Sequence, residues 1–395
     1  MEERGVDQIT EVTSTSWFAR LGQAIFGVLI GLILVVVSIG VLFWNEGRAI
    51  RTAQGLAEGA GIVRSVSADS VDRSNDGRLI HVTGMLSTAG PVTDPDFALR
   101  VQGVRLERHV EVYQWKEETH SETRTRLGGG EERTTTYKYV RTWSDKPIDS
   151  DRFKEPRSHT NPVMTYQSRD LLAAGTRLGA FAVPDSLLRG FGEPRRVRAT
   201  EVQANALQIR TNKPVAVNDG VLYVGRDPSQ PAIGDMRISF AEVPLQTGSV
   251  VAAQAGSGFA PFPTHTGTTV ELIAAGAVPP KVMFQHAQEE NVTMTWVLRL
   301  AGVVIMLIGF SLVLRPLSVA ASVIPLLGDV MGAGTFLVAL VCTAAIAPIV
   351  IAFGWLWYRP LVGIGVLVVG AAATWGLSQL LHTRAAAKKA GRLAA

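Results

Sequence analysis

Four long apolar runs constrain this chain more than any other feature of its sequence. They occupy residues 21–43, 296–314, 330–353 and 361–381, and Arg299 is the only charged residue within them. An α-helix rises about 1.5 Å per residue, so roughly 20 residues cross a hydrocarbon core about 30 Å thick. The hydrophobic content of 47% against 18% charged residues fits that length argument. The runs therefore predict four transmembrane helices rather than helices buried in a soluble core.

The first run has three possible interpretations: a cleaved signal peptide, a buried core helix or a membrane anchor. A signal peptide has an apolar stretch of about 7 to 15 residues followed by small residues at the cleavage site. Here the longer run ends in Phe43 and Trp44, and the polar sequence Asn45–Arg48 follows. The run is therefore predicted to be a retained anchor. Gly27 and Gly31 form a GxxxG pair on it, which is a candidate face for helix packing.

The C-terminal tail predicts the orientation. It contains Arg384, Lys388, Lys389 and Arg392 and no acidic residue, so the positive-inside rule makes it cytoplasmic. Four spans then put the N-terminus on the same side. The predicted order is a cytoplasmic segment 1–20, helix 21–44, an extracytoplasmic domain 45–295, helix 296–314, a cytoplasmic interfacial linker 315–329, helices 330–353 and 361–381, and a basic cytoplasmic tail 382–395. The net charge of +4 then reflects topology and gives no reason to expect nucleic acid as a partner.

The region between the first two spans is predicted to be rich in β-strands. Its apolar and β-branched stretches alternate with turn residues such as Asn218-Asp219-Gly220. The only cysteine, Cys342, lies in the third apolar run, so no disulfide can stabilise this domain. Helical spacing after Trp44 and a helix start at Pro280 predict that the first two spans continue into it. The fold class is thus an α+β integral membrane protein with four transmembrane helices, one N-terminal and three C-terminal, and a large β-rich extracytoplasmic domain inserted between the first and second.

Residues 109–127 and 131–143 flank three consecutive glycines and predict one long β-hairpin. A turn centred on Gly129 pairs Trp115 with Trp143 and Glu117 with Arg141. The distal part is polar on both faces, so we expect it to project into water or toward a partner; the alternative is a disordered loop over 120–136. The candidate interaction residues are Arg124, Arg126, Glu131, Glu132 and Arg133.

Motifs for catalysis are absent from the sequence. None of the seven histidines forms an HExxH motif, and no nucleophile elbow or glycine-rich nucleotide loop occurs. We therefore expect no catalytic residues, no metal and no cofactor. A set of polar residues could converge across strands, although structural ion pairs are the default interpretation: Asp76, Arg78, His81, Glu107, Arg108 and His109. Arg299 lies one turn inside the second span and is expected to snorkel to the headgroups.

Six blocks of sequence carry a resemblance to a known family. They are NEGRAIRTAQGLAEG (45–59), DGRLIHVTG (76–84), VRLERHVEVYQW (104–115), HTNP (159–162), GDMRISF (234–240) and GWLWYRP (354–360). In this order, and with one span before and three after the large domain, they resemble the transmembrane protein 43 family, also called LUMA. The family-motif residues are Asn45, Glu46, Gly47, Arg48, Arg108, His109 and Trp115.

The resemblance implies a large luminal or extracytoplasmic domain and, in animal members, residence in the endoplasmic reticulum and inner nuclear membrane with a scaffolding role. The use of 30 Arg against 8 Lys suggests a bacterial source, for which the expected location is the plasma (inner) membrane. We expect a non-enzymatic membrane scaffold or envelope-stress protein that contacts the lipid bilayer, forms a homo-oligomer and binds other membrane or envelope proteins. The alternative is a membrane-tethered enzyme acting on envelope lipids or polymers.

Overall fold

The computed structural model describes residues 8–359, and these residues divide into two compact units. Residues 8–15, 54–126 and 131–289 form a β-rich unit. Residues 16–53, 127–130 and 290–359 form a helical unit. The predicted fourth span, 361–381, and the basic tail, 382–395, lie outside the described residues.

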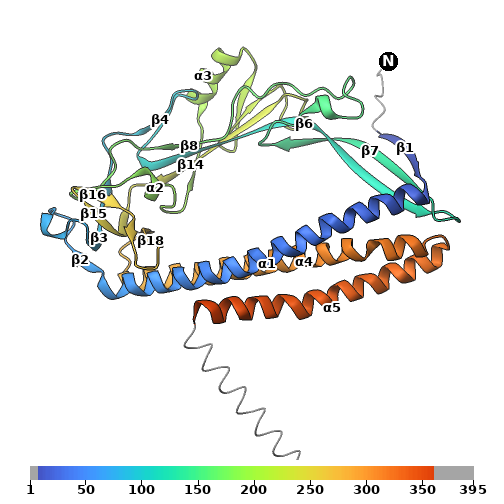
Figure 1. Cartoon of the computed structure of the whole chain (residues 1–395). Helices are drawn as coiled ribbons and strands as arrows, with labels where there is room; N and C mark the ends of the chain where they lie inside the picture. The colour runs from blue at the N-terminus through green and yellow to red at the C-terminus, as the bar shows by residue number, and fades with distance from the viewer. Residues whose placement is uncertain (1–7, 360–395) are drawn as a thin grey trace, which may run out of the picture. The chain divides into compact units, whose positions relative to one another are not determined.

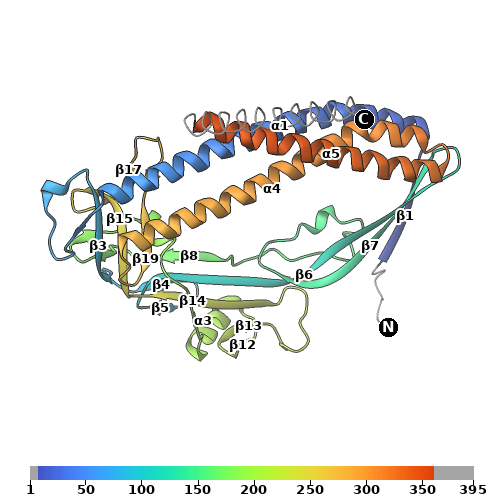
Figure 2. The same cartoon turned by 90° about the horizontal axis from the view of Figure 1, so that it is seen from below.

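Three long helices build the helical unit: α1 (Trp17–Ile62), α4 (Pro280–Ala321) and α5 (Pro325–Tyr358) (Figures 1 and 2). Each is long and apolar enough to cross a membrane. The start of α4 at Pro280 and the continuation of α1 to Ile62 confirm the helical extensions predicted on both sides of the β-rich region.

Glycines allow α1 and α4 to approach closely. A Cβ atom added to Gly31 would lie 2.6 Å from the carbonyl oxygen of Gly309, and one added to Gly309 would lie 2.9 Å from that of Gly31. Gly27 is more loosely packed, with Leu312 Cδ2 at 3.9 Å. The glycine face considered for helix packing thus contacts α4 of the same chain.

The predicted linker 315–329 is helical over most of its length. Helix α4 continues through Pro316 to Ala321, and α5 begins at Pro325, so only residues 322–324 separate them. Pro325 occupies the first turn of α5, where its missing N–H costs no hydrogen bond. The connection is therefore a tight helical hairpin rather than an extended interfacial segment.

The largest sheet has eight strands, in the order β1-β7-β6-β14-β13-β12, with β11 beside β14 and β8 beside β6. Its core is formed by Leu106, Val110 and Val112 on the buried face of β6, together with Ile238 and Phe240 of β14. The strands are β1 (Gln8–Thr15), β6 (Gly103–Thr125), β7 (Glu131–Ser144), β8 (Arg169–Leu172), β11 (Arg195–Val197), β12 (Val215–Asn218), β13 (Val221–Val224) and β14 (Met236–Pro244).

A second sheet of seven strands has the order β19-β15-β16-β10-β9-β3-β2 and its own core around Phe181, Phe191 and Val250. Two short strand pairs and two short helices complete the unit. The remaining elements are β2 (Arg64–Val66), β3 (Leu79–Ser87), β4 (Val92–Asp94), β5 (Leu99–Val101), β9 (Arg177–Leu178), β10 (Phe181–Ala182), β15 (Thr247–Ala255), β16 (Gly258–Ala260), β17 (Phe262–Pro263), β18 (Thr269–Val270), β19 (Leu272–Ala275), α2 (Asp185–Leu188) and α3 (Glu201–Thr211).

The β-rich region and both predicted hairpins are confirmed. Strands β12 and β13 join through Asp219 and Gly220, which both have positive φ as a two-residue turn requires. Strands β6 and β7 pair over fourteen consecutive residues, but the turn centres on Gly128 rather than Gly129. Trp143 therefore faces Tyr113 and Arg141 faces Trp115, so the predicted cross-strand partners are shifted by two residues along β6. A shift of two residues leaves each side chain on the same face of the sheet as predicted.

The close approach of α1 and α4 gives a matched pair of variants. Gly31→Ala forces a methyl group against the Gly309 carbonyl, and overpacking of this kind costs about 1–3 kcal/mol. Gly40 on the same helix has no atom within 4 Å of an added Cβ, so Gly40→Ala should leave stability unchanged or raise it slightly. Thermal unfolding of both variants in detergent measures the difference, and equal midpoints would contradict the packing.

Candidate functional site

A buried ion pair joins α1 to α4. Arg299 Nε donates to Glu46 Oε1 at 2.7 Å, and Arg299 Nη2 donates to Glu46 Oε2 at 2.8 Å. The Glu46 side chain is 1% exposed and that of Arg299 is 20% exposed. The expectation that Arg299 snorkels to the headgroups is therefore wrong. A carboxylate on the neighbouring helix offers two parallel charge-assisted hydrogen bonds, which fix both side chains.

Polar side chains extend this contact by further turns of both helices. Arg48 donates to Asn291 Oδ1 at 3.0 Å and to Thr295 Oγ1 at 3.0 Å. Asn45 donates to the Thr295 carbonyl oxygen at 3.1 Å, and Asn291 donates to the Ala49 carbonyl oxygen at 3.0 Å. The network satisfies polar groups that would otherwise be costly to bury. We call Asn45, Glu46, Arg48, Asn291, Thr295 and Arg299 the helix lock.

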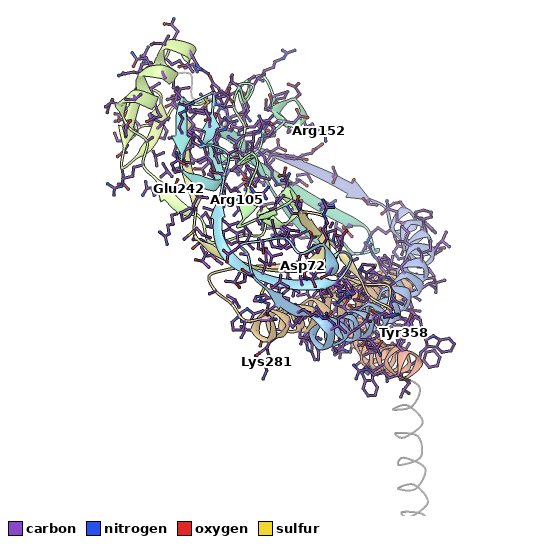
Figure 3. The ribbon with its side chains drawn as sticks, turned by 90° about the vertical axis from the view of Figure 1, so that its left-hand side faces the viewer. Asp72, Arg105, Arg152, Glu242, Lys281 and Tyr358 are labelled. Atoms are coloured by element: carbon purple, nitrogen blue, oxygen red, sulfur yellow. The ribbon has the colours of Figure 1, made fainter. Side chains whose placement is uncertain are left out.

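Helix α5 packs against the same part of α1. A Cβ atom added to Gly47 would overlap the ring of Tyr358, the residue labelled near the end of α5 in Figure 3. Gly354 of α5 lies against Glu46, with 3.2 Å from an added Cβ to the Glu46 side chain. Two sequence blocks that are more than 300 residues apart, NEGR and GWLWY, thus meet in one packed contact. The helix lock is closed, and its contacts hold helices together rather than leaving a binding site.

Breaking the ion pair tests the helix lock. Glu46→Gln leaves Arg299 without its counter-charge, and removing one partner of a buried pair typically costs about 3–5 kcal/mol. Arg299→Gln should cost a similar amount, whereas the double variant should lose less than the sum of the two. Thermal unfolding of the three variants in detergent gives the coupling, and strictly additive losses would refute the pair.

The base of the β6–β7 hairpin is held by side chains that bond to backbone. Asn161 accepts from the Trp115 N–H at 2.7 Å and donates to the Trp115 carbonyl oxygen at 2.9 Å. It therefore replaces a neighbouring strand at the point where β14 has ended. Gln114 likewise donates to the Lys146 carbonyl oxygen and accepts from the Ile148 N–H, both at 3.0 Å. The blocks HVEVYQW and HTNP thus have a structural role, which the sequence alone did not reveal.

Aromatic rings reinforce the hairpin base. The His159 ring stacks on Tyr139 with 3.8 Å between centroids, and the Trp115 and His159 rings form a T-shaped pair with 4.8 Å between centroids. The Tyr139 hydroxyl donates to Glu117 at 2.9 Å and accepts from the Glu155 N–H at 2.8 Å. The loop after β7 is therefore bound to the hairpin by polar and ring contacts at once.

Beyond this base the hairpin has no apolar face. Lys116, Glu118, His120, Glu122 and Arg124 lie along one face of β6, include charges of both signs and are all exposed. Arg124 lies 3.9 Å from Glu122, and Arg126 pairs with Glu132. The remaining candidate interaction residues, Glu131 and Arg133, begin β7. The alternative of a disordered loop over 120–136 is not what the structure contains.

The hairpin turn contacts helix ends instead of projecting freely. Arg20 donates to the Gly129 carbonyl oxygen at 2.5 Å, and the Gly128 N–H donates to the Val323 carbonyl oxygen at 3.1 Å. An added Cβ at Gly129 would overlap the Trp17 ring. Residues 127–130 therefore belong to the helical unit, and the expected free projection of the tip is wrong.

An N-terminal strand, β1, adds to the hairpin. All eight of its residues pair with β7, from Gln8 opposite Lys138 to Thr15 opposite Glu131. Glu11 also accepts from Lys154 Nζ at 2.8 Å. The alternation in QITEVTST could have indicated this strand, which the sequence analysis missed.

The pairing of β1 sets a condition on topology. Helix α1 begins two residues after β1 ends, so a single crossing by α1 separates residues 8–15 from those after Asn45. The cytoplasmic location of 1–20 and the extracytoplasmic location of 45–295 stay predictions, and the pairing of β1 with β7 requires residues 8–15 and 131–138 to lie on one side of the membrane.

Cysteine labelling tests this condition. Leu127 is 88% exposed and Val12 is 60% exposed, so Leu127→Cys and Val12→Cys, each with Cys342→Ser, should react with a membrane-impermeant maleimide from the same side of sealed vesicles. Modification from opposite sides would show that β1 does not pair with β7 in the membrane.

The polar residues considered for convergence do not meet. His81 of β3 donates from Nε2 to the Val278 carbonyl oxygen at 3.0 Å and bonds Ser65 through Nδ1, and burial lowers its pKa. Asp76 accepts from the Gly256 N–H, whereas Glu107 pairs with Arg105. Arg78 and His109 are exposed, and His109 lies on β6 of the other sheet. These residues serve separate structural contacts.

Arg108 is the exception, because it lies in a charged cluster beside a cavity. It donates to both oxygens of Asp94 at 3.0 and 2.9 Å and to Asp96 at 2.8 Å. Burial raises the pKa of Asp94, opposed by the Arg108 charge. Arg108 and Asp96 line an open cavity of about 500 Å³ with residues 165–169.

A second open cavity of about 370 Å³ is lined by residues 147–151, 160–164 and 167. Neither cavity contains Asp76, His81, Glu107 or His109, and no metal-binding group of three or more His, Cys, Asp or Glu occurs within residues 8–359.

Three apolar helices joined to a large two-sheet region define an integral membrane protein of the α+β class. The sequence model for transmembrane protein 43 matches residues 112–360. The chain belongs to the transmembrane protein 43 family.

The similarity to individual members extends over almost the whole chain. Transmembrane protein 43 from Homo sapiens is 31% identical over 94% of this chain and 93% of its own length. The Mus musculus protein is 30% identical over 90% of both chains, and the Drosophila melanogaster homolog is 28% identical over 87% of this chain. No solved structure matches this chain significantly.

Proposed function

We propose that this protein is a non-catalytic membrane scaffold whose polar hairpin makes reversible contacts with other membrane or envelope proteins. The observation that carries the proposal is the distal hairpin, which keeps charged side chains exposed on a rigidly anchored pair of strands. The Arg124 and Glu122 side chains are 85% and 62% exposed, so they contribute little to the fold. Charged groups in such positions are suited to steering and specificity.

The arrangement of polar residues favours the scaffold over an enzyme. Asp76, His81, Glu107 and His109 are engaged in separate contacts or exposed, and none lines either cavity. The helix lock is closely packed, with Gly47 against Tyr358 and Gly354 against Glu46. A hydrolase acting on envelope lipids would need a nucleophile and a base within hydrogen-bond reach beside a cavity. For the location we propose the plasma membrane of a bacterium, on the strength of the excess of Arg over Lys.

A charge-neutral double substitution tests the scaffold. Glu122→Ser with Arg124→Ser removes one acid and one base from the exposed face of the hairpin while leaving the strand intact. Because no buried contact is lost, the thermal midpoint should be unchanged, while cross-linking to other proteins in native membranes should fall several-fold. Quantitative cross-linking and pull-down from those membranes measure the effect.

The control is a second pair of the same type and spacing. Glu193 and Arg195 are also exposed and lie two residues apart, but outside the hairpin. Glu193→Ser with Arg195→Ser should leave cross-linking at the level of the parent protein. An equal loss in both variants, or no loss in the hairpin variant, would overturn the proposed role of the hairpin.

A further inference from the structure

The distal hairpin and β1 form a three-stranded ribbon with two unpaired edges. The ribbon consists of β1, residues 131–138 of β7 and residues 116–125 of β6 (Figure 1). One edge is β1, the last strand of its sheet. The other is β6 beyond Trp115, because β14 pairs with β6 only as far as Val112 and Asn161 satisfies Trp115. No described strand covers either edge.

The opposite end of the same sheet shows how an edge is normally protected. Strand β12 has only four residues and follows Lys213 and Pro214. A short edge strand, a lysine and a proline each discourage the pairing of a further strand. Strand β1 has eight residues, no proline and no basic residue. Its single charge, Glu11, is neutralised by Lys154. Nothing on β1 discourages the addition of another strand.

The β6 edge is charged but balanced. Lys116 lies 3.1 Å from Glu118, and His120 and Arg124 lie 3.8 and 3.9 Å from Glu122. The charges of Lys116 and Arg124 balance those of Glu118 and Glu122, so the edge presents hydrogen-bonding groups with little net charge. Like charges that face each other across two strands are unfavourable, so an edge of mixed sign repels an incoming strand less than an edge of one sign does.

We propose that the β1 edge of one copy pairs with the β6 edge of the next copy of this chain. Both strands run antiparallel to β7, so they are parallel to each other, and copies inserted the same way up can join head to tail. The edges match in length, with eight residues on β1 and ten on β6. Repetition of one such contact closes a ring when the rotation per copy allows it. The inference rests on the scaffold proposal and names its partner, a second copy.

The attachment of β1 to a helix that is long and apolar enough to cross a membrane favours pairing between copies. Ser16 alone separates β1 from α1, so every copy holds its β1 edge at the same end of this helix. Confinement of the copies to one membrane raises their effective concentration.

Disulfide trapping tests the pairing directly. All variants carry Cys342→Ser. Val12→Cys is co-expressed with Glu118→Cys, His120→Cys or Glu122→Cys, which lie on the same face of the ribbon. We expect disulfide dimers for at least one combination, on the order of ten-fold above either single variant alone. Each copy carries a single cysteine, so any disulfide must join two copies.

The outcomes separate the alternatives. Dimers with Val12→Cys alone would show that two β1 edges pair with each other and would overturn the head-to-tail contact. The control combination of Val12→Cys with Val202→Cys, which lies exposed on α3, should give only background. Background levels for all three hairpin positions would also overturn the contact. The capture of other proteins through Glu122 and Arg124 is measured separately, so either proposal can fail without the other.

Discussion

The close packing of α1 against α4 is the constraint on which the helical unit depends. Apolar helices gain no hydrophobic free energy when they exchange contacts with lipid for contacts with one another. Their association must therefore come from close packing and from polar contacts. Gly31 and Gly309 supply the first by letting the two backbones touch. Glu46 and Arg299 supply the second, because an unpaired charge at this depth would be costly. Together they fix which faces of the two helices meet.

The β-rich unit follows a different rule, because its strands serve two purposes. Strand β6 buries Leu106, Val110 and Val112 in a core and then continues as a polar ribbon without one. The change occurs at residues 113–115, where β14 ends and side chains of Gln114 and Asn161 bind backbone groups in its place. A strand this long would otherwise fray where its core stops. The side-chain contacts therefore allow a folded domain to extend a rigid, charged arm.

Several features could be predicted from sequence because they depend on local pattern or length. The apolar runs predicted helices, and three of them are helices with the length to cross a membrane. Pro280, Asn218-Asp219-Gly220 and the glycines at 128–130 marked a helix start and two turns, since each depends on backbone preferences of neighbouring residues. The hairpin register was missed by one step, because three adjacent glycines leave the centre of the turn undetermined. Strand β1 was missed because its partner strand, β7, is distant in sequence: Gln8 pairs with Lys138 and Thr15 with Glu131.

The sequence by itself determined that this is a membrane protein of the transmembrane protein 43 type with a β-rich region and no disulfide, because hydropathy, turn residues and the single cysteine are properties of the chain. Only the tertiary structure decided what the polar residues do. Arg299 meets Glu46, Asn161 caps Trp115, Arg20 binds the turn at Gly129, and Glu11 meets Lys154. Each of these contacts joins residues more than 40 positions apart, and the partner of a charged or amide side chain is fixed by which elements pack together rather than by its neighbours in sequence.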